Sequence, residues 1–216
     1  MKDSLDPQRL FGAAAHGRLV GAEGEVLEVV ESTMDTARRL AVSGAPDGYA
    51  VLAERQRSGR GRTGCWECPP KEGLLLSVIL RLGLPAAERK LFALTGAVAA
   101  AEALRQFCPP VQIKWPNDLV VAQDGEMLSV RKLGGVLVEQ CGEGDAAPVH
   151  MLGIGVNVNQ DRRRLPQQVP IPASSLKIEL GGRTLDRNEV CMRLLEKLDF
   201  WYGKLRLGYQ EAVLAR

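Results

Sequence analysis

A loop rich in arginine and glycine, enclosed by two apolar segments, constrains the fold of this chain more than any other feature. The segments 49–54 (YAVLAE) and 74–81 (LLLSVILR) have the length and composition of buried strands. Residues 55–64 (RQRSGRGRTG), which follow the first strand, hold four arginines and three glycines. Guanidinium and backbone N–H groups on such a loop can close around an anion. The pattern predicts a phosphate- or carboxylate-binding loop between two strands, although a solvated loop or a nucleic-acid tether has a similar composition.

Two further charged segments lie beyond this loop. Residues 114–119 (KWPNDL) set a cation, an indole, an amide and a carboxylate close together. Residues 131–136 (RKLGGV) place a lysine before two glycines, where backbone can approach a ligand closely. Taken singly, a Trp-Pro pair is also typical of a core, and a Gly-Gly pair of a β-bulge. Together with the arginine loop, these segments indicate a site for an anionic, phosphorylated ligand.

Strand patterns dominate the middle of the chain, and helix patterns flank them. Seven segments predict strands: 25–30, 49–54, 74–81, 111–115, 119–122, 136–139 and 149–158. Three predict helices: 34–43, 86–107 and 186–205, the last opened by an Asp-x-x-Glu capping box. A D-G turn is expected at 123–126 and an exposed loop at 160–172. The order predicts an α+β fold, with helices packed on a mixed or largely antiparallel central sheet.

Composition narrows the class of protein. With 216 residues, 45% of them hydrophobic, the chain is long enough for one sizeable domain. Its 28 basic and 26 acidic residues nearly balance, whereas nucleic-acid-binding domains usually carry a clear basic excess. No apolar run approaches the ~18 residues of a membrane span, and the start MKDSLDPQRL lacks the apolar stretch of a signal peptide. We expect a cytoplasmic protein without nucleic-acid or membrane partners.

The five cysteines indicate reduced thiols, because their number is odd and no secretory signal precedes them. Cys65 and Cys68 form a C-x-x-C pair, a spacing also found in redox and zinc sites. A zinc site needs two more ligands, and the chain has two histidines, His16 and His150. The favoured interpretation is an ordinary reduced pair in a loop.

In chain order, residues 31–33 (EST), Gln56, the GRGR loop, KWPNDL, RKLGG and residues 153–157 (GIGVN) resemble the catalytic domain of biotin protein ligases. The resemblance covers nearly all of the chain except its N-terminal segment. It implies the class II synthetase-like fold of biotin and lipoate ligases. It also implies a two-step reaction: biotin and ATP, with Mg²⁺, form biotinyl-5'-adenylate and pyrophosphate, and the biotinyl group then passes to one lysine of a biotin carboxyl carrier domain of the acetyl-CoA carboxylase type.

The resemblance also implies roles for individual residues. Those implied to bind biotin are Ser32, Thr33, Gln56, Arg60, Gly61, Arg62, Lys132, Gly134 and Gly135. Those implied to bind ATP are Arg62, Trp66, Asn117, Lys132 and Asn157. The implied catalytic residues are Arg62, Lys132, Asp118 and Lys114, and Asp118 is also the implied magnesium ligand.

The chemistry of these side chains suits such roles. Arg62 and Lys132 would offset the repulsion between a carboxylate and a phosphate that approach each other. Trp66 offers a broad face for adenine. Asp118 could orient the acceptor lysine or take its proton, although an aspartate at this position also suits a simple turn.

The sequence departs from the family pattern in two places. Ser32, Thr33 and Gln56 complement the ureido ring of biotin, yet Met34 follows where the family usually has asparagine. Ser32 or Thr33 also suits a helix N-cap, and the two roles are compatible. The loop reads GRGRTGCW instead of Gly-Arg-Gly-Arg-x-Gly-Arg-x-Trp, so one residue and the later arginine are missing. We expect weaker ordering of the loop, or a compensating cation from Lys71.

The domain expectation is a single ligase catalytic domain over residues 1–216. No helix-turn-helix pattern precedes Glu25, which argues against DNA-binding repression, and a small C-terminal β-barrel domain is expected to be absent or truncated. The expected partners are the carrier domain and the small substrates, and a homodimer is left open. Two alternatives remain: a lipoate-type ligase, and a non-catalytic biotin-binding protein.

Overall fold

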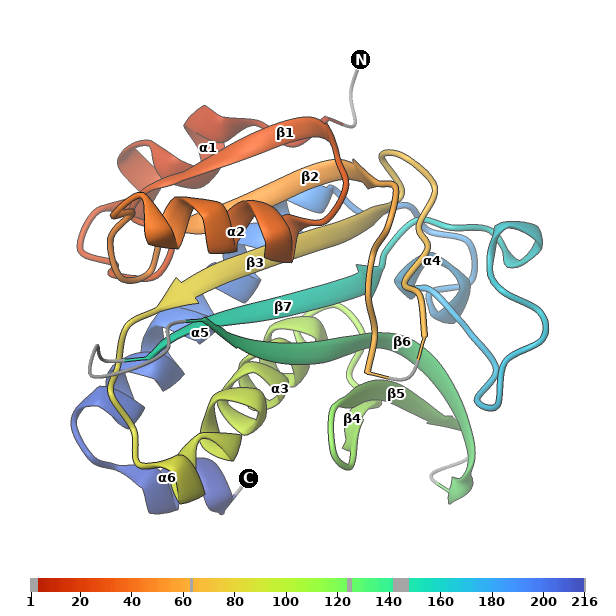
Figure 1. Ribbon diagram of the computed structural model, residues 1–216. Coiled ribbons are helices and arrows are strands. Elements are labelled where there is room, and N and C mark those ends of the chain that lie inside the picture. The colour runs from red at the N-terminus through yellow and green to blue at the C-terminus, as the bar shows by residue number, and fades with distance from the viewer. Residues whose placement is uncertain (1–3, 63, 124–125, 142–147, 216) are drawn as a thin grey trace.

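A twisted sheet of seven strands forms the centre of the molecule (Figure 1). The structure is a computed structural model that describes residues 4–62, 64–123, 126–141 and 148–215. The strands, in sheet order, are β1 (Gly24–Val30), β2 (Ala50–Gln56), β3 (Gly73–Leu80), β7 (Val149–Asn157), β6 (Glu126–Cys141), β5 (Asp118–Gln123) and β4 (Val111–Lys114). Only the β1–β2 pair is parallel among the described pairs, and the other neighbours run antiparallel.

Helices cover both faces of this sheet. Figure 1 shows α2 (Thr33–Val42) in front of it, together with the connection from β2 to β3, and α3 (Lys90–Arg105) and α5 (Arg187–Arg206) behind it. Three short α-helices, α1 (Pro7–Phe11), α4 (Leu176–Glu179) and α6 (Gln210–Leu214), and three 3₁₀ turns are also present in the described part. The sheet lies between these layers, so every residue of β3 is buried. The predicted α+β class with a mixed sheet is confirmed.

Local sequence explains where the main helices lie. The hydroxyl of Ser32 accepts a hydrogen bond from the Met34 N–H and caps α2 as expected. Alanine and glycine let α3 approach the sheet closely, because a Cβ on Gly96 would meet Leu152 Cδ1 at 2.7 Å. Asp186 caps α5 by accepting from the Asn188 N–H.

Several sequence expectations need correction. The predicted helix 86–107 begins as a separate 3₁₀ turn (Ala86–Glu88) before α3, and the predicted strand 136–139 belongs to the much longer β6. The sequence analysis missed α1, α4 and α6, which have five, four and five residues. Helices this short have too few turns to produce a clear apolar period. Two residues of the expected D-G turn, 124–125, lie outside the described residues.

A buried ion pair joins the first half of the sheet to the last long helix. Arg187, at the start of α5, is fully buried and contacts the Glu54 carboxylate of β2 at 2.8 Å. Its Nη1 also donates to the Gly73 carbonyl of β3, and Glu54 Oε1 accepts from the Leu5 N–H. Removing one member of a buried pair is costly because the other charge stays desolvated. The pair therefore fixes the two strands that carry the arginine–glycine loop.

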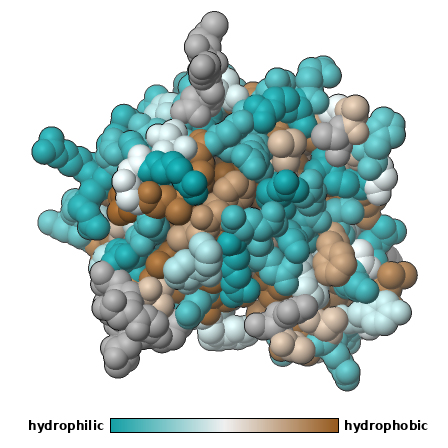
Figure 2. Space-filling model, turned by 180° about the vertical axis from the view of Figure 1, so that it is seen from behind, coloured by the Kyte–Doolittle hydropathy of each residue, from teal (hydrophilic) through white to brown (hydrophobic). Residues whose placement is uncertain are grey.

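The surface behind the sheet is mostly polar. Figure 2, which views the molecule from the side of α3 and α5, shows hydrophilic residues over most of that face, with apolar residues in small groups. The described part of the chain contains no helix with the length and hydropathy of a membrane span.

Candidate functional site

The charged segments singled out in the sequence meet around one cavity of about 610 Å³. The start of α2, the arginine–glycine loop, the β4–β5 turn, β6, β7 and residues 166–173 line it. The predicted site residues on its wall are Ser32, Thr33, Gln56, Arg60, Gly61, Arg62, Trp66, Lys114, Asn117, Asp118, Lys132, Gly135 and Asn157. Gly134 is not on the wall. A Cβ there would meet the Gly155 carbonyl at 2.5 Å, so this glycine allows β6 and β7 to approach each other.

One end of the cavity is an ordered set of polar side chains. Gln56 Oε1, at the end of β2, accepts from both the N–H and the hydroxyl of Thr33 at 2.8 and 2.9 Å. Ser77 of β3 in turn donates to the Thr33 hydroxyl at 2.8 Å. Ser32 and Thr33 are buried, so their rotamers are held by the sheet beneath them. This group can present donors and acceptors to a small neutral polar ring.

A cation and a carboxylate face each other on another part of the cavity wall. Lys132 Nζ of β6 lies 2.6 Å from Asp118 Oδ1, at the start of β5. The β5–β6 pairing brings the two strands together here, and residues 172–174 run beside Lys132, whose N–H donates to the Pro172 carbonyl. The lysine is only part-buried and can turn toward an anion that enters the cavity.

The arginine–glycine loop folds back on itself above the site. The Gly61 N–H donates to the Gly64 carbonyl at 2.7 Å, and the Trp66 N–H to the Gly59 carbonyl at 2.9 Å. Arg62, between these bonds, is an exposed residue on the cavity wall. The backbone therefore holds Arg62 where its guanidinium can reach an anion.

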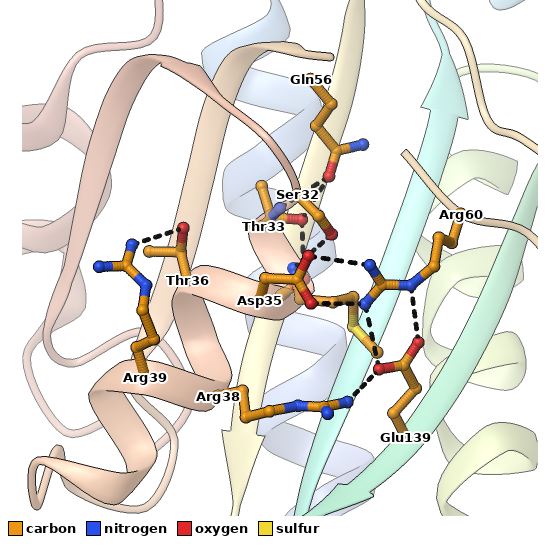
Figure 3. Close-up of polar contacts among 11 residues, drawn as sticks. Ser32, Thr33, Asp35, Thr36, Arg38, Arg39, Gln56, Arg60 and Glu139 are labelled. Atoms are coloured by element: carbon orange, nitrogen blue, oxygen red, sulfur yellow. Dashed lines mark hydrogen bonds and ion pairs between the residues drawn. The ribbon is translucent and has the colours of Figure 1, made fainter. Parts of the chain in front are cut away.

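Arg60, by contrast, is occupied by the protein itself. Its guanidinium binds Asp35 of α2 through two hydrogen bonds, at 2.8 and 2.9 Å, and Glu139 of β6 through two more, at 3.1 and 3.2 Å (Figure 3). These hydrogen bonds, first those to Asp35, raise the pKa of Arg60 above its ordinary value. The side chain thus joins the loop to α2 and β6. Arg60 also lines the cavity, and its implied contact with biotin stays a prediction.

The Trp66 ring packs against β7 at Gly155. A Cβ on Gly155 would meet the Trp66 ring at 2.6 Å, so only a glycine accommodates the indole at this position. The indole Nε1 is buried without a hydrogen-bond partner among the described residues. The indole edge that carries Nε1 is packed against β7, whereas Trp66 also lines the cavity, where a bound ligand can lie against the ring.

The two predicted asparagines already have partners within the protein. Asn157 donates to the Ser174 carbonyl and accepts from Gln160, and Asn117 donates to the Val136 carbonyl. Each amide keeps one further N–H or lone pair for a ligand. Their role toward a nucleotide stays a prediction.

The sequence analysis missed the apolar part of the wall. Met34, Leu76, Val136, Leu137 and Ile154 line the cavity together with the exposed Trp115 and residues 169–171. Met34 Sδ would lie 2.7 Å from a Cβ on Gly153, so the glycine of β7 makes room for this methionine. The only local signal was the continuous apolar run of strands such as β3 and β7, which marks a buried strand but does not say which of its residues face a cavity.

Lys71 and Cys68 do not line the cavity, whereas Cys65 does. Lys71 Nζ pairs with Glu28 at 3.5 Å, so the structure gives no support to the expected compensating cation. Cys65 is exposed, and burial raises the pKa of the Cys68 thiol to about 12, which keeps it protonated at neutral pH. Neither Cys65 nor Cys68 belongs to a metal-binding cluster of the described residues.

Magnesium fits this site only as a companion of phosphate groups. No cluster of three or more His, Cys, Asp or Glu side chains that could hold a metal occurs among the described residues. Asp118 offers one carboxylate, which Lys132 already contacts. Mg²⁺ commonly binds one or two carboxylates together with substrate phosphates and water. Asp118 can therefore hold a magnesium ion that arrives with a triphosphate.

Comparison with known proteins agrees with this geometry. Residues 26–159 match the model of the biotin/lipoate A/B protein ligase family, which is more than half of the chain. The chain belongs to this family.

Relatives within the biotin/lipoate A/B protein ligase family include biotin ligases of several bacteria. The biotin–[acetyl-CoA-carboxylase] ligase of Mycobacterium tuberculosis is 35% identical over 210 residues, which are 92% of this chain and 72% of the relative. The bifunctional ligase/repressor BirA of Bacillus subtilis is 33% identical over 78% of this chain and 50% of the relative. The chain thus spans about half the length of the bifunctional relatives that it matches.

Solved structures of the family share the fold. The biotin protein ligase of Aquifex aeolicus, in complex with biotin and ATP, superposes with a TM-score of 0.64 at 29% identity, over 85% of this chain and 72% of that one. This likeness confirms the expected fold of the biotin and lipoate ligases, with its mixed sheet and packed helices.

Proposed function

We propose that this chain is a biotin protein ligase that uses ATP to form biotinyl-5'-adenylate and then transfers the biotinyl group to a lysine of a biotin carboxyl carrier domain. The observation that carries the proposal is that three groups line the same cavity: the polar side chains around Gln56, the arginine–glycine loop with Arg62, and the Lys132–Asp118 pair. The name of the Mycobacterium tuberculosis relative supports acetyl-CoA carboxylase as the source of the carrier. We propose that residues 1–216 form one ligase domain, located in the cytoplasm, and a homodimer is left open.

The first step is adenylation. A carboxylate oxygen of biotin attacks the α-phosphorus of ATP, and the bond to the β-phosphate oxygen breaks to release pyrophosphate. Two anions must approach for this, so Arg62 and Lys132 offset their repulsion, and Lys132 turns from Asp118 toward the phosphate. Removing one such donor from a closed site typically costs about 2.7 to 4 kcal/mol of transition-state stabilisation. The ring of biotin is held by Ser32, Thr33 and Gln56, and the adenine by Trp66. Magnesium, when bound near Asp118, neutralises phosphate charge.

The second step is transfer to the carrier. The amine of the carrier lysine attacks the acyl carbon of the adenylate, an amide forms, and AMP leaves with the electrons of the broken C–O bond. An unperturbed lysine has a pKa of about 10.4 and is mostly protonated at neutral pH. A carboxylate at the cavity wall can accept that proton, and Asp118 is released for this once Lys132 contacts the adenylate.

Two other functions fit parts of the site. A lipoate-type ligase would share the fold and the adenylation chemistry, because the family name covers both acids. A non-catalytic biotin-binding protein would need only the polar end of the cavity. The shortened loop, which lacks the later arginine of the family pattern, is the observation that favours this second alternative.

One experiment separates the three. Pyrophosphate release from ATP and magnesium is measured with biotin and with lipoate, alongside transfer of labelled biotin to a carrier domain. Release with biotin and transfer to the carrier supports the proposal. Pyrophosphate release without transfer places the defect in the second step. Pyrophosphate release with lipoate alone supports a lipoate ligase. Biotin binding in calorimetry without pyrophosphate release supports the binding protein.

A further inference from the structure

Among the described residues of the arginine–glycine loop, Arg60 is the one arginine whose guanidinium makes four hydrogen bonds to carboxylates. Asp35 lies in the first turn of α2, directly after the residues that line the polar end of the cavity. Glu139 lies on β6, the strand that also carries Lys132 and Gly135. Figure 3 shows Asp35 and Glu139 converging on Arg60 from these two elements. One arginine therefore fastens the loop to both elements that hold the other site residues.

The network extends beyond this triad. Arg38, one turn after Asp35 on α2, reaches the same Glu139 carboxylate at 2.5 Å. Glu139 thus receives hydrogen bonds from two guanidinium groups, and α2 and β6 are joined directly as well as through the loop. Exposed single ion pairs contribute little, but bidentate arginine–carboxylate pairs within a network are the recognised exception.

We propose that Asp35 and Glu139 are positioning residues that hold the arginine–glycine loop closed over the cavity through Arg60, and so keep Arg62 directed at the anionic substrate. Neither carboxylate lines the cavity, so each acts through the loop and not on the ligand. Arg60 and Arg62 are separated by one glycine, whose N–H is bonded across the loop to the Gly64 carbonyl. Fixing Arg60 therefore limits how far Arg62 can move. Hydrogen bonds from Arg60 also keep the pKa of Asp35 below its ordinary value, so this carboxylate stays charged at neutral pH.

The first test needs no substrate. Hydrogen exchange of the backbone amides of residues 59–66 is compared between the ligand-free wild type, Asp35→Asn, Glu139→Gln and the double variant. Loss of the network should speed exchange of this segment roughly fivefold in the double variant, the size expected for a bidentate pair worth about 1 kcal/mol. Arg60→Met should speed exchange of this segment as much as the double variant does. Combining Arg60→Met with Asp35→Asn should speed exchange little further. Unchanged exchange in the double variant overturns the proposal.

The matched control is Glu196→Gln, which removes another surface arginine–carboxylate pair, Arg193–Glu196, on α5 behind the sheet. This variant should leave exchange at residues 59–66 unchanged. Thermal unfolding of every variant tests for general destabilisation. If the control accelerates exchange as much as the double variant does, the effect is not specific to the network and the proposal fails.

The second test rests on the proposed ligase function. The Glu139→Gln and Asp35→Asn variants should raise KM for biotin roughly fivefold in pyrophosphate release while kcat stays within about twofold, because the closed loop is weakened but the reacting groups remain. High salt should reduce the difference from wild type, since the network is partly exposed and screened. A KM for biotin that is unchanged in both variants overturns a positioning role. Absence of biotin-dependent turnover in the wild type would instead refute the proposed function, and the exchange test would still decide this inference.

Discussion

Lys132 combines two roles at the scale of a single residue: it pairs with Asp118 and is proposed to meet the phosphate. Lys132→Ala should lower the rate of biotin-dependent pyrophosphate release by about 10²- to 10³-fold, as removal of a donor from an oxyanion site does. The measurement is kcat for pyrophosphate release, with thermal unfolding to confirm the fold.

The chain offers a closely matched control for this substitution. Lys197 pairs with Glu102 at 3.0 Å on the helices behind the sheet, and its pair is exposed to a similar degree as the Lys132–Asp118 pair. Lys197→Ala should keep normal activity. Activity in Lys132→Ala equal to that of this control would contradict the assignment of Lys132 to the site.

His150 provides a second prediction at this scale. It is buried on β7 against Phe92, with ring centroids 4.4 Å apart, and neither ring nitrogen has a hydrogen-bond partner among the described residues. Burial, and then the charge of Arg89, lower the pKa of His150 below its ordinary value. Between that lowered pKa and the ordinary value of about 6.5, the unfolded chain binds a proton that the folded chain does not. The free energy of unfolding therefore falls as the pH drops below about 6.5.

Urea unfolding at pH 7.5 and pH 5 tests the direction of this pH dependence. The wild type should lose more free energy of unfolding between the two pH values than His150→Leu does, because the variant has no imidazole to bind a proton. Equal losses in wild type and His150→Leu would show that His150 binds its proton equally well in both states.

At the scale of elements, β7 supports the site through its glycines. Gly155 gives Trp66 its place, since a Cβ would come within 2.6 Å of the ring. Gly155→Ala should therefore displace the indole, lower the free energy of unfolding by about 1 to 3 kcal/mol, and shift the tryptophan emission. Gly203→Ala on α5 is the matched control, because a Cβ there meets nothing within 4 Å, and it should stabilise the helix by about 0.5 to 1 kcal/mol. An unshifted emission in Gly155→Ala would contradict this contact.

The sequence predicted elements better than it predicted their contacts. The long helices and the apolar strands were found because each carries its signal within a few turns or alternations. The cavity residues came from the family resemblance, and all of them except Gly134 line the same cavity in the structure. The Arg60 network was missed because Asp35 and Glu139 lie 25 and 79 residues away along the chain, and nothing local marks an arginine as paired. Long-range pairing is fixed by strand order and register, which the sequence pattern leaves open.

At the scale of the whole molecule, the proposed function requires a second protein to approach the cavity, because the acceptor lysine of a carrier would have to reach the adenylate. Trp115 lies on the cavity wall and is 69% exposed, between the strands β4 and β5. An exposed indole beside a reactive cavity is a typical anchor for a protein partner. Lys114 and Arg62, on the same wall, give this side of the molecule a basic character.

Trp115→Ala should therefore separate the two steps of the proposed reaction. Pyrophosphate release with biotin should stay near the wild-type rate, whereas transfer to the carrier should fall by about tenfold in kcat/KM for the carrier, since truncating an anchor residue commonly costs more than 1 kcal/mol. Phe200→Ala, which removes an aromatic residue that is 51% exposed on α5 behind the sheet, should change neither step. If Trp115→Ala slows pyrophosphate release as much as transfer, the indole acts on the small substrates, and the carrier binds by another route.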